Sequence, residues 1–332
     1  MDTLQIVWFF LIVSFFAIYA ILDGFDLGVG FWHLFARRED RPNLFYLVGP
    51  LWDGNEVWFL AFGGAMFAAF PQVYATLFSG FYLLVMIVIF AFMFRGIAID
   101  FRNKSASKAW QGVWDIVFAV ASITIPLIVG IAVGNLLYGL KIDSNMNYFG
   151  TFSDLLNPYA LLVGLLALLM CATHGASYIV MKTGGALQER AVSWSFKACG
   201  FYMAIFFILC IATIFTLPHL FRNYTSHPFL FLLPIITLLS MLAIIIFNTG
   251  GNDVKSFVAS IFSVAGTMAT LGIALFPVLV YARNNADLSL TIMNSSASPY
   301  ALKTLLIVVI LGMPLVIAYQ IWVYRKFAGK VT

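Results

Sequence analysis

The feature that most constrains this chain is a series of long apolar runs. A helix crosses the hydrocarbon core of a bilayer with about 20 apolar residues. The 332-residue sequence holds about nine stretches of that kind, over 4–35, 44–70, 77–98, 114–138, 157–181, 199–217, 229–247, 257–281 and 301–324. Charged residues make up only 10% of the chain, and no soluble domain fits between the runs. We therefore predict an all-α, polytopic integral membrane protein, in which residues 1–332 form a single transmembrane domain of about nine helices packed as bundles.

The loops between the runs alternate in charge. Of the 18 Lys and Arg residues, 14 fall in one set of loops, and four fall in the other: Lys141, Arg222, Arg283 and Lys303. Because basic residues concentrate in cytoplasmic loops, the richer set is expected in the cytoplasm. This places the N-terminus outside and the C-terminus in the cytoplasm, in agreement with an odd number of spans. The net charge of +4 then reflects topology, and no nucleic-acid partner is expected.

Four carboxylates lie inside the first two predicted spans, where burying charge is expensive. Asp23 and Asp26 belong to DGFD, and Asp53 and Glu56 belong to WDGNE, so each pair is spaced i, i+3 on one helix face. In an antiparallel hairpin, residues that are equally far from the turn lie at the same depth. If the first hairpin turns near position 39.5, Asp26 is level with Asp53, and Asp23 is level with Glu56. The next hairpin, which turns near position 74, places Arg95 level with Asp53. The sequence thus predicts a layer of four acids and one guanidinium in the C-terminal half of the first span.

Two interpretations of this layer remain open. Ionisable residues within a membrane are costly and commonly mark proton or ion pathways. Four carboxylates beside one Arg repel one another, so ionising all of them is unfavourable. A proton relay requires a carboxyl group that can gain and lose a proton. Alternatively, Arg95 and one acid form a structural ion pair while the other acids reach cytoplasmic water.

Other candidate residues carry weaker signals. Gly24 and Gly28 form a G-x-x-x-G pattern, which lets membrane helices approach closely. His174 lies inside the fifth predicted span, where a histidine can ligate haem. Without a second His, Met or Cys at ligand spacing, we expect it to be hydrogen-bonded structurally. The sequence shows no metal-ligand cluster, nucleophile triad or phosphate-binding loop, so it predicts no catalytic centre in this chain.

Several motifs together resemble subunit II of the cytochrome bd-type quinol oxidases. They are LDGFDLGVG (22–30), GPLWDGNEVWF (49–59), AAFPQVYATLFSGFY (68–82), FRGIAIDFR (94–102), GIAVGNLL (130–137) and LLNPYALL (155–162). The resemblance is dense over residues 1–180 and looser over 181–332, where it rests on the number of spans and on TGGND (249–253).

The resemblance implies a membrane heterodimer that oxidises quinol and reduces dioxygen to water. It implies a location in a bacterial or archaeal cytoplasmic membrane, in contact with lipid and quinone. The partner, subunit I, would ligate haem b and haem d and carry the quinol-oxidation loop, and small single-helix accessory subunits can join the complex. Subunit II would bind no haem, support haem assembly in subunit I and contribute a proton path from the cytoplasm.

The resemblance also implies which residues form that path and its supporting ion pairs: Asp23, Asp26, Asp53, Asn55, Glu56, Arg95 and Asp100. Family members can have Gln at the place of Glu56, and Asp100 can also simply face water. Two other function classes stay open. A proton-coupled secondary transporter would use similar acids but favours inverted repeats, which the sequence does not show. A purely structural membrane subunit would keep the acids as an assembly device.

Overall fold

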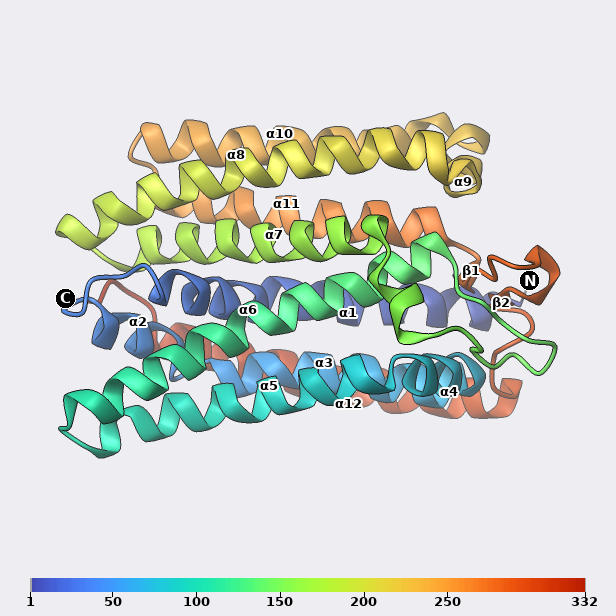
Figure 1. The fold of residues 1–332 in the computed structure, drawn as a ribbon, viewed down its shortest axis with the longest axis horizontal. Coiled ribbons are helices and arrows are strands. Elements are labelled where there is room, and N and C mark those ends of the chain that lie inside the picture. Colours follow the sequence, from blue (N-terminus) through green and yellow to red (C-terminus); the bar gives the residue numbers. More distant parts are fainter. Residues whose placement is uncertain (1, 332) are drawn as a thin grey trace.

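The computed structural model describes residues 2–331, and it is built almost entirely of helices (Figure 1). The α-helices are α1 (Thr3–His33), α2 (Arg41–Val48), α3 (Trp52–Ala69), α4 (Pro71–Gly80), α5 (Tyr82–Phe101), α6 (Lys108–Tyr138), α7 (Pro158–Lys182), α8 (Gly185–Thr216), α9 (Arg222–Ser226), α10 (Leu232–Thr249), α11 (Asp253–Leu275) and α12 (Pro299–Lys326). The 3₁₀ turns are η1 (Arg102–Lys104), η2 (Phe152–Leu156), η3 (Pro218–Phe221), η4 (Pro228–Phe231) and η5 (Ala286–Leu288). Two short strands, β1 (Val278–Val280) and β2 (Leu290–Thr291), pair antiparallel.

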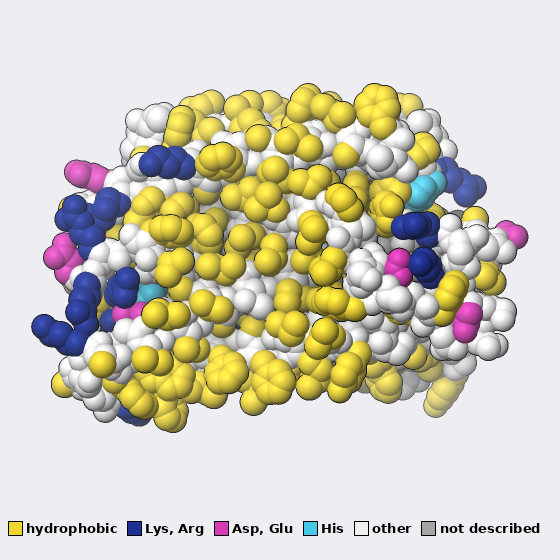
Figure 2. Space-filling model, viewed as in Figure 1, with side chains coloured by type: hydrophobic (Ala, Val, Ile, Leu, Met, Phe, Trp, Pro, Cys, Tyr) yellow, Lys and Arg dark blue, Asp and Glu magenta, His cyan; other side chains and the backbone are white. Residues whose placement is uncertain are grey.

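Length and apolar composition qualify eight of these helices to cross a membrane. They are α1, α5, α6, α7, α8, α10, α11 and α12, with η1 and η4 extending α5 and α10. Figure 2 shows apolar side chains over the middle of the visible face and charged side chains mostly at its two ends. This distribution is the one a bilayer requires of the surface of a helical bundle. The predicted all-α, polytopic membrane fold is confirmed.

The predicted second span, 44–70, is wrong as a single helix. The structure interrupts it between α2 and α3, around Gly49 and Pro50, because proline lacks a backbone N–H and disfavours helical geometry in the residue before it. The polar residues Asp53, Asn55 and Glu56 fill the start of α3 and keep it out of the eight apolar helices. α3 nevertheless runs alongside α1 within the bundle (Figure 1).

Several helix ends also differ from the apolar runs. α8 begins at Gly185 rather than at residue 199, because its first turns carry polar residues such as Glu189 and Arg190 that a hydropathy pattern excludes. The predicted third span began at residue 77, whereas α5 begins at Tyr82 after the separate helix α4. A helix that leaves the hydrocarbon continues into water as long as its backbone hydrogen bonds persist, so apolar runs mark the lipid-facing part only.

Four helices begin with a side-chain cap. Asp2, Ser107, Asn157 and Ser298 accept hydrogen bonds from the first backbone N–H groups of α1, α6, α7 and α12. Such caps satisfy donors that have no partner within the helix and are worth about 1 kcal/mol each. They therefore fix where these four helices start.

Helix α1 is the central element of the bundle. It contacts α3, α6, α7, α11 and α12, and every residue from 23 to 30 is buried. The N- and C-termini lie at opposite ends of the molecule (Figure 1). The DGFD motif is thus held in the interior, where neighbouring helices determine its surroundings.

Gly28 allows α1 and α7 to touch. A Cβ atom on Gly28 would lie 1.9 Å from the backbone oxygen of Cys171 and 2.8 Å from the Cα atom of Gly175. Gly24 has more room, since its nearest neighbour, the Sγ atom of Cys171, would lie 3.7 Å from an added Cβ. Of the two glycines in the G-x-x-x-G pattern, Gly28 makes the close backbone approach.

We expect Gly28→Ala to separate α1 from α7 and to lower stability by about 1–3 kcal/mol, the usual effect of overpacking. The protein should accumulate less in membranes and melt at a lower temperature in detergent. Gly24→Ala is the matched control, and it should melt close to wild type because its Cβ meets only ordinary contacts. Equal melting temperatures for the two variants would contradict the close approach at Gly28.

Candidate functional site

Arg95 lies at the centre of a buried group of ionisable side chains. It comes from α5, and its side chain is 1% exposed. Its Nη2 atom lies 2.7 Å from Oδ1 of Asp23 on α1 and donates a hydrogen bond to Oε2 of Glu56 on α3 at 3.1 Å. Asp23 is fully buried, whereas Glu56 is 21% exposed. A buried guanidinium needs such counter-charges, so Arg95 ties three helices together.

Asn55 forms a second junction beside this ion pair. Its Nδ2 atom donates to Oδ2 of Asp26 at 2.7 Å. Its Oδ1 atom accepts from Nε2 of Gln320 at 2.7 Å and from the hydroxyl of Tyr324 at 2.9 Å. Gln320 and Tyr324 are one turn apart on α12 and therefore share a face. Asn55 thus links α1, α3 and α12, using both ends of its amide.

Many buried polar atoms of this region have no hydrogen-bond partner within residues 2–331. They are both carboxylate oxygens of Asp23, Oδ1 of Asp26, Nε and Nη1 of Arg95, the hydroxyl of Tyr19 and Nε1 of Trp58. The Asp23 carboxylate reaches Arg95 as an ion pair. Buried polar groups are nearly always hydrogen-bonded, and ordered water is the usual partner where the protein supplies none. The site is therefore suited to hold water beside its carboxylates.

The first hairpin predicts two pairs of acids at equal depth, and the structure brings together only one of these pairs. Asp23 and Glu56 do meet, through Arg95. Asp26 meets Asn55 rather than Asp53. Asp53 is exposed on α3, without a hydrogen bond or ion pair to the described residues. Two residues along a helix turn the side chain through about 200°, so Asn55 faces the interior and Asp53 faces outward.

Asp100 also lies apart from the buried network. It is exposed in the last turn of α5, and none of the described residues forms a hydrogen bond or ion pair with it. The predicted layer of four acids is therefore corrected to three, Asp23, Asp26 and Glu56, which lie around Arg95 and Asn55.

His174 does not fit the role of a haem ligand. Its Nδ1 atom lies 2.7 Å from Oγ of Ser260, and its Nε2 atom lies 2.9 Å from the backbone oxygen of Ile21. The ring also stacks on Phe257, with centroids 5.1 Å apart. Both ring nitrogens are engaged, so neither is free for iron. Within residues 2–331, no group of three or more His, Cys, Asp and Glu side chains is placed to hold a metal ion.

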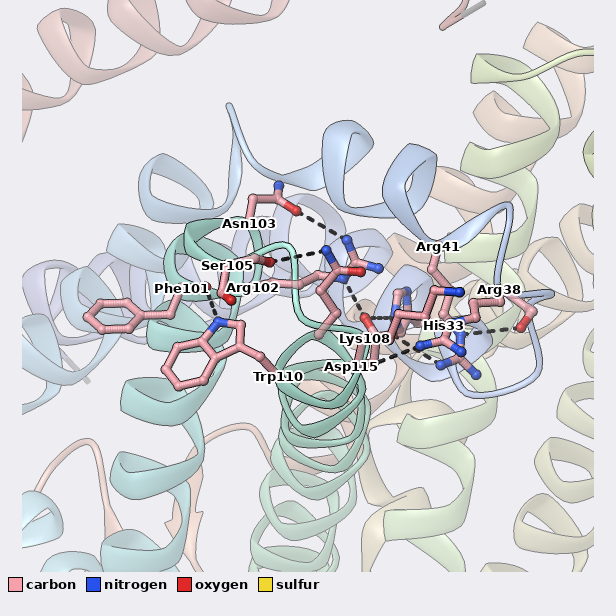
Figure 3. A network of polar contacts seen from close by, with 12 residues as sticks. His33, Arg38, Arg41, Phe101, Arg102, Asn103, Ser105, Lys108, Trp110 and Asp115 are labelled. Atoms are coloured by element: carbon pink, nitrogen blue, oxygen red, sulfur yellow. Dashed lines mark hydrogen bonds and ion pairs between the residues drawn. The ribbon is translucent and has the colours of Figure 1, made fainter.

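A second buried cluster was missed by the sequence reasoning (Figure 3). Asp115 on α6 places Oδ1 3.0 Å from Nε2 of His33 and 2.5 Å from Nε of Arg102, and Oδ2 3.1 Å from Nη1 of Arg41. His33, Asp115 and Arg102 are buried, and the side chain of Arg41 is 25% exposed. The available signal was an acid inside the predicted span 114–138.

Comparison with known proteins identifies the family. A family profile described as cytochrome bd terminal oxidase subunit II matches residues 4–327. The chain belongs to that family. This match confirms the resemblance inferred from the motifs, and it covers both the dense and the looser part of the sequence. As a member of the family, the chain is a subunit of a bd-type terminal oxidase complex.

Individual relatives match along nearly their whole length. The chain is 34% identical to the cytochrome bd ubiquinol oxidase subunit 2 of Bacillus subtilis, over 100% of this chain and 98% of the relative. It is 30% identical to the cytochrome bd-I ubiquinol oxidase subunit 2 of Escherichia coli K12, over 100% and 96%. A probable cytochrome oxidase subunit 2 of Haemophilus influenzae is 31% identical, over 99% and 96%.

The fold has a solved counterpart. A chain in the structure of the bd oxidase from Geobacillus thermodenitrificans superposes with a TM-score of 0.82 at 18% sequence identity, over 98% of this chain and 99% of that chain. The bundle described above is therefore the fold of a bd oxidase subunit.

Proposed function

We propose that this chain pairs with a haem-bearing subunit I in a quinol oxidase and carries protons from the cytoplasm toward the site where subunit I reduces dioxygen. The relatives named as ubiquinol oxidase subunits support quinol as the reductant of the complex. The observation that carries the proton-path proposal is the buried network of Asp23, Asp26 and Glu56 around Arg95 and Asn55. Oxygen consumption by a purified complex that carries Asp53→Asn tests it.

The composition of the network suits proton transfer. Arg95 offers one positive charge to three neighbouring acids, so the acids cannot all stay ionised at equal cost. The unpartnered oxygens of Asp23 and Asp26 and the hydroxyl of Tyr19 supply acceptors and a donor to which water can bind. Protons move along such chains of carboxyl groups and water in membrane proteins. Arg95 holds the carboxylates in place rather than carrying the proton itself.

Glu56 connects the buried network to the surface of the bundle. It contacts Arg95 on its inner side and is partly exposed. Asp53 lies one turn earlier on α3, at a spacing that makes side chains neighbours on a helix. A proton that reaches Asp23 thus has a route through Glu56 to Asp53 at the outer face of α3.

That face of α3 has the pattern of a helix-packing seam. The side chains of Asp53, Val57, Leu60 and Phe67, together with Gly64, are all exposed. They are spaced by alternating four and three residues, which produces one continuous stripe for a neighbouring helix. A carboxylate that faces lipid hydrocarbon is costly. We therefore assign this stripe to the contact with subunit I, where Asp53 hands protons over.

Haem chemistry is assigned to subunit I. His174, the candidate haem ligand of the sequence, does not fit a haem because both of its ring nitrogens are engaged. We propose that haem b and haem d of the complex lie in the partner, and that this chain supports their assembly by completing the interface. The junctions at Arg95 and Asn55 also favour a structural contribution, since they join four helices. The proton path and the structural contribution are distinguished by turnover in a complex that assembles normally.

Membership in an oxidase family removes the reason to propose a proton-coupled transporter. The 14 to 4 division of Lys and Arg supports the proposed orientation. The richer set lies at the end of the bundle that holds the C-terminus, where Figure 2 shows most of the visible Lys and Arg side chains. We assign this end to the cytoplasm, which is also where the proposed path begins.

A fusion experiment tests the orientation. A reporter enzyme that is active only outside the cytoplasm should be inactive when fused after Lys330 and active when inserted after Asn223. Lys330 follows α12, and Asn223 lies in α9 at the opposite end of the bundle (Figure 1). Activity after Lys330 and none after Asn223 would reverse the orientation and place the start of the path on the other side.

A further inference from the structure

His33 lies on the same face of α1 as Asp26. Seven residues separate them, which is two helical turns and about 10 Å along the axis. On α6, Asp115 and Ser122 are also seven residues apart and therefore share a face. The helices α1 and α6 pack against each other. The two helices therefore bring a second set of polar side chains from the Asp115 cluster toward the carboxylate network.

Ser122 occupies the interval between His33 and Asp26. A Cβ atom on Gly30 would lie 2.0 Å from Oγ of Ser122, so this hydroxyl rests on the backbone of α1. Gly30 is four residues after Asp26 and three before His33, on the side of α1 that they share. The absence of a side chain at Gly30 is what makes room for the hydroxyl.

The polar atoms along this interval share an unusual property. Nδ1 of His33, Oγ of Ser122 and Oδ1 of Asp26 are buried and have no hydrogen-bond partner within residues 2–331. His33 and Ser122 are both 0% exposed. These three atoms lie at successive depths, and two of them are on one face of α1. Each can form a hydrogen bond with water or with the next group, so together they can pass a proton along the helix.

We propose that His33 is the residue that collects protons at the cytoplasmic end of the path and passes them through Ser122 to Asp26. The proposal rests on the proposed function. Asp115 accepts the hydrogen bond from Nε2–H of His33, which leaves Nδ1 as the basic nitrogen. A proton from cytoplasmic water binds Nδ1 and forms an imidazolium. The imidazolium then releases this proton from Nδ1 to a bridging water that passes a proton to the Ser122 hydroxyl, the hydroxyl's own proton moves through a second water to the Asp26 carboxylate, and the imidazole returns to its neutral form.

The charges around His33 suit a transient carrier. Asp115 on α6 faces it directly, and Arg41 on α2 and Arg102 on η1 both pair with that carboxylate. Phe45 and Phe118 cover the ring, with centroids 4.8 and 5.5 Å away. The two guanidiniums offset the charge of Asp115, so the imidazolium forms without being trapped. Arg41, which is partly exposed, marks where the cluster opens to solvent.

The same contacts would be present if the cluster served only to clamp α1, α2, η1 and α6 together. A clamp and a relay differ in their dependence on pH. A clamp needs the hydrogen bond between His33 and Asp115, which an amide can also make. A relay needs a group that titrates, and its loss is felt most where protons are scarce.

The test uses the purified complex with the whole chain carrying His33→Gln. Glutamine keeps a donor for Asp115 but cannot carry a proton. We expect normal haem content and melting temperature, with oxygen consumption at least about fivefold below wild type at pH 8 and within about twofold at pH 6, where bulk protons reach Asp26 more often. His174→Gln, a buried histidine outside this path, is the control and should show no such pH dependence. A wild-type pH profile for His33→Gln would overturn the proposal.

Ser122→Ala covers the case in which His33→Gln fails to assemble. It leaves the Asp115 cluster intact and should show the same loss at high pH, whereas Thr124→Val on the same helix should not. A wild-type profile for an assembled Ser122→Ala complex would also overturn the proposal. If Asp53→Asn is impaired while Ser122→Ala and His33→Gln are not, the path exists but begins elsewhere. If Asp53→Asn is also unimpaired, the proposed function itself fails.

Discussion

A complex that carries Arg95→Ala should accumulate in membranes at a small fraction of the wild-type level. Arg95 is the guanidinium that faces both Asp23 and Glu56. Removing one partner of a buried ion pair costs about 3–5 kcal/mol, because the remaining charge is left uncompensated. Arg95→Lys should restore part of the yield, since lysine keeps the charge but lacks the planar fork that reaches two acids.

The measurement is the amount of haem-loaded complex per milligram of membrane protein, together with its melting temperature. Arg37→Ala is the control. Its side chain and that of Glu39 are 65% and 73% exposed, and exposed pairs contribute little. A double variant, Arg95→Leu with Asp23→Asn, should recover part of the assembly, because only the partly exposed Glu56 keeps an uncompensated charge, but it should not recover turnover. Normal yield and turnover for Arg95→Ala would show that the arginine is dispensable.

Asp53→Asn should leave a complex with normal haem content that consumes oxygen at least about tenfold more slowly, a difference of about 1.4 kcal/mol in the limiting step. Asparagine keeps the size and polarity of the side chain but cannot carry a proton. Asp53 forms no hydrogen bond or ion pair to the described residues, so its replacement should not disturb the fold. The variant therefore separates a relay from an assembly device.

Two further substitutions at and near this position sharpen the result. Asp53→Glu should retain more activity than Asp53→Asn, with an altered pH profile, because a carboxyl group remains at a shifted place. Glu39→Gln, which neutralises an exposed acid at the end of the bundle that we assign to the cytoplasm, should consume oxygen at the wild-type rate. Equal losses in Asp53→Asn and Glu39→Gln would point to a general effect of surface charge.

The depth of the buried acids along the bundle could be predicted from the sequence, but the direction in which each side chain points could not. A helix rises by a constant amount per residue, so counting from the first hairpin turn placed Asp23 level with Glu56, and these two do meet through Arg95. Counting from the second turn placed Arg95 level with Asp53 instead. The first hairpin also placed Asp53 level with Asp26. In the structure, however, it is Asn55 that forms a hydrogen bond with Asp26. The direction of each side chain depends on how α3 is rotated about its own axis relative to its neighbours. The break at Gly49 and Pro50 changes that rotation, so it cannot be counted from the preceding helix.

Contacts between distant segments were also beyond the sequence. Gln320 is 265 positions from Asn55, and no local pattern connects them. The Asp115 cluster was missed for a different reason. Arg41 and Arg102 were counted as loop charges that set topology, and in the structure they turn inward to Asp115, a carboxylate near the start of α6. The family motifs, in contrast, identified the family correctly, because they record combinations of residues rather than single positions.

The most direct test of the proton path is proton uptake by oriented vesicles that contain the complex. A pH-sensitive dye on the cytoplasmic side, read together with oxygen consumption, reports how many protons enter and how fast. We predict that Asp53→Asn slows proton uptake and oxygen consumption by the same factor, at least about tenfold, at unchanged haem content. Uptake at the wild-type rate in a fully assembled Asp53→Asn complex would contradict the account and would leave the carboxylates of this chain with a structural role only.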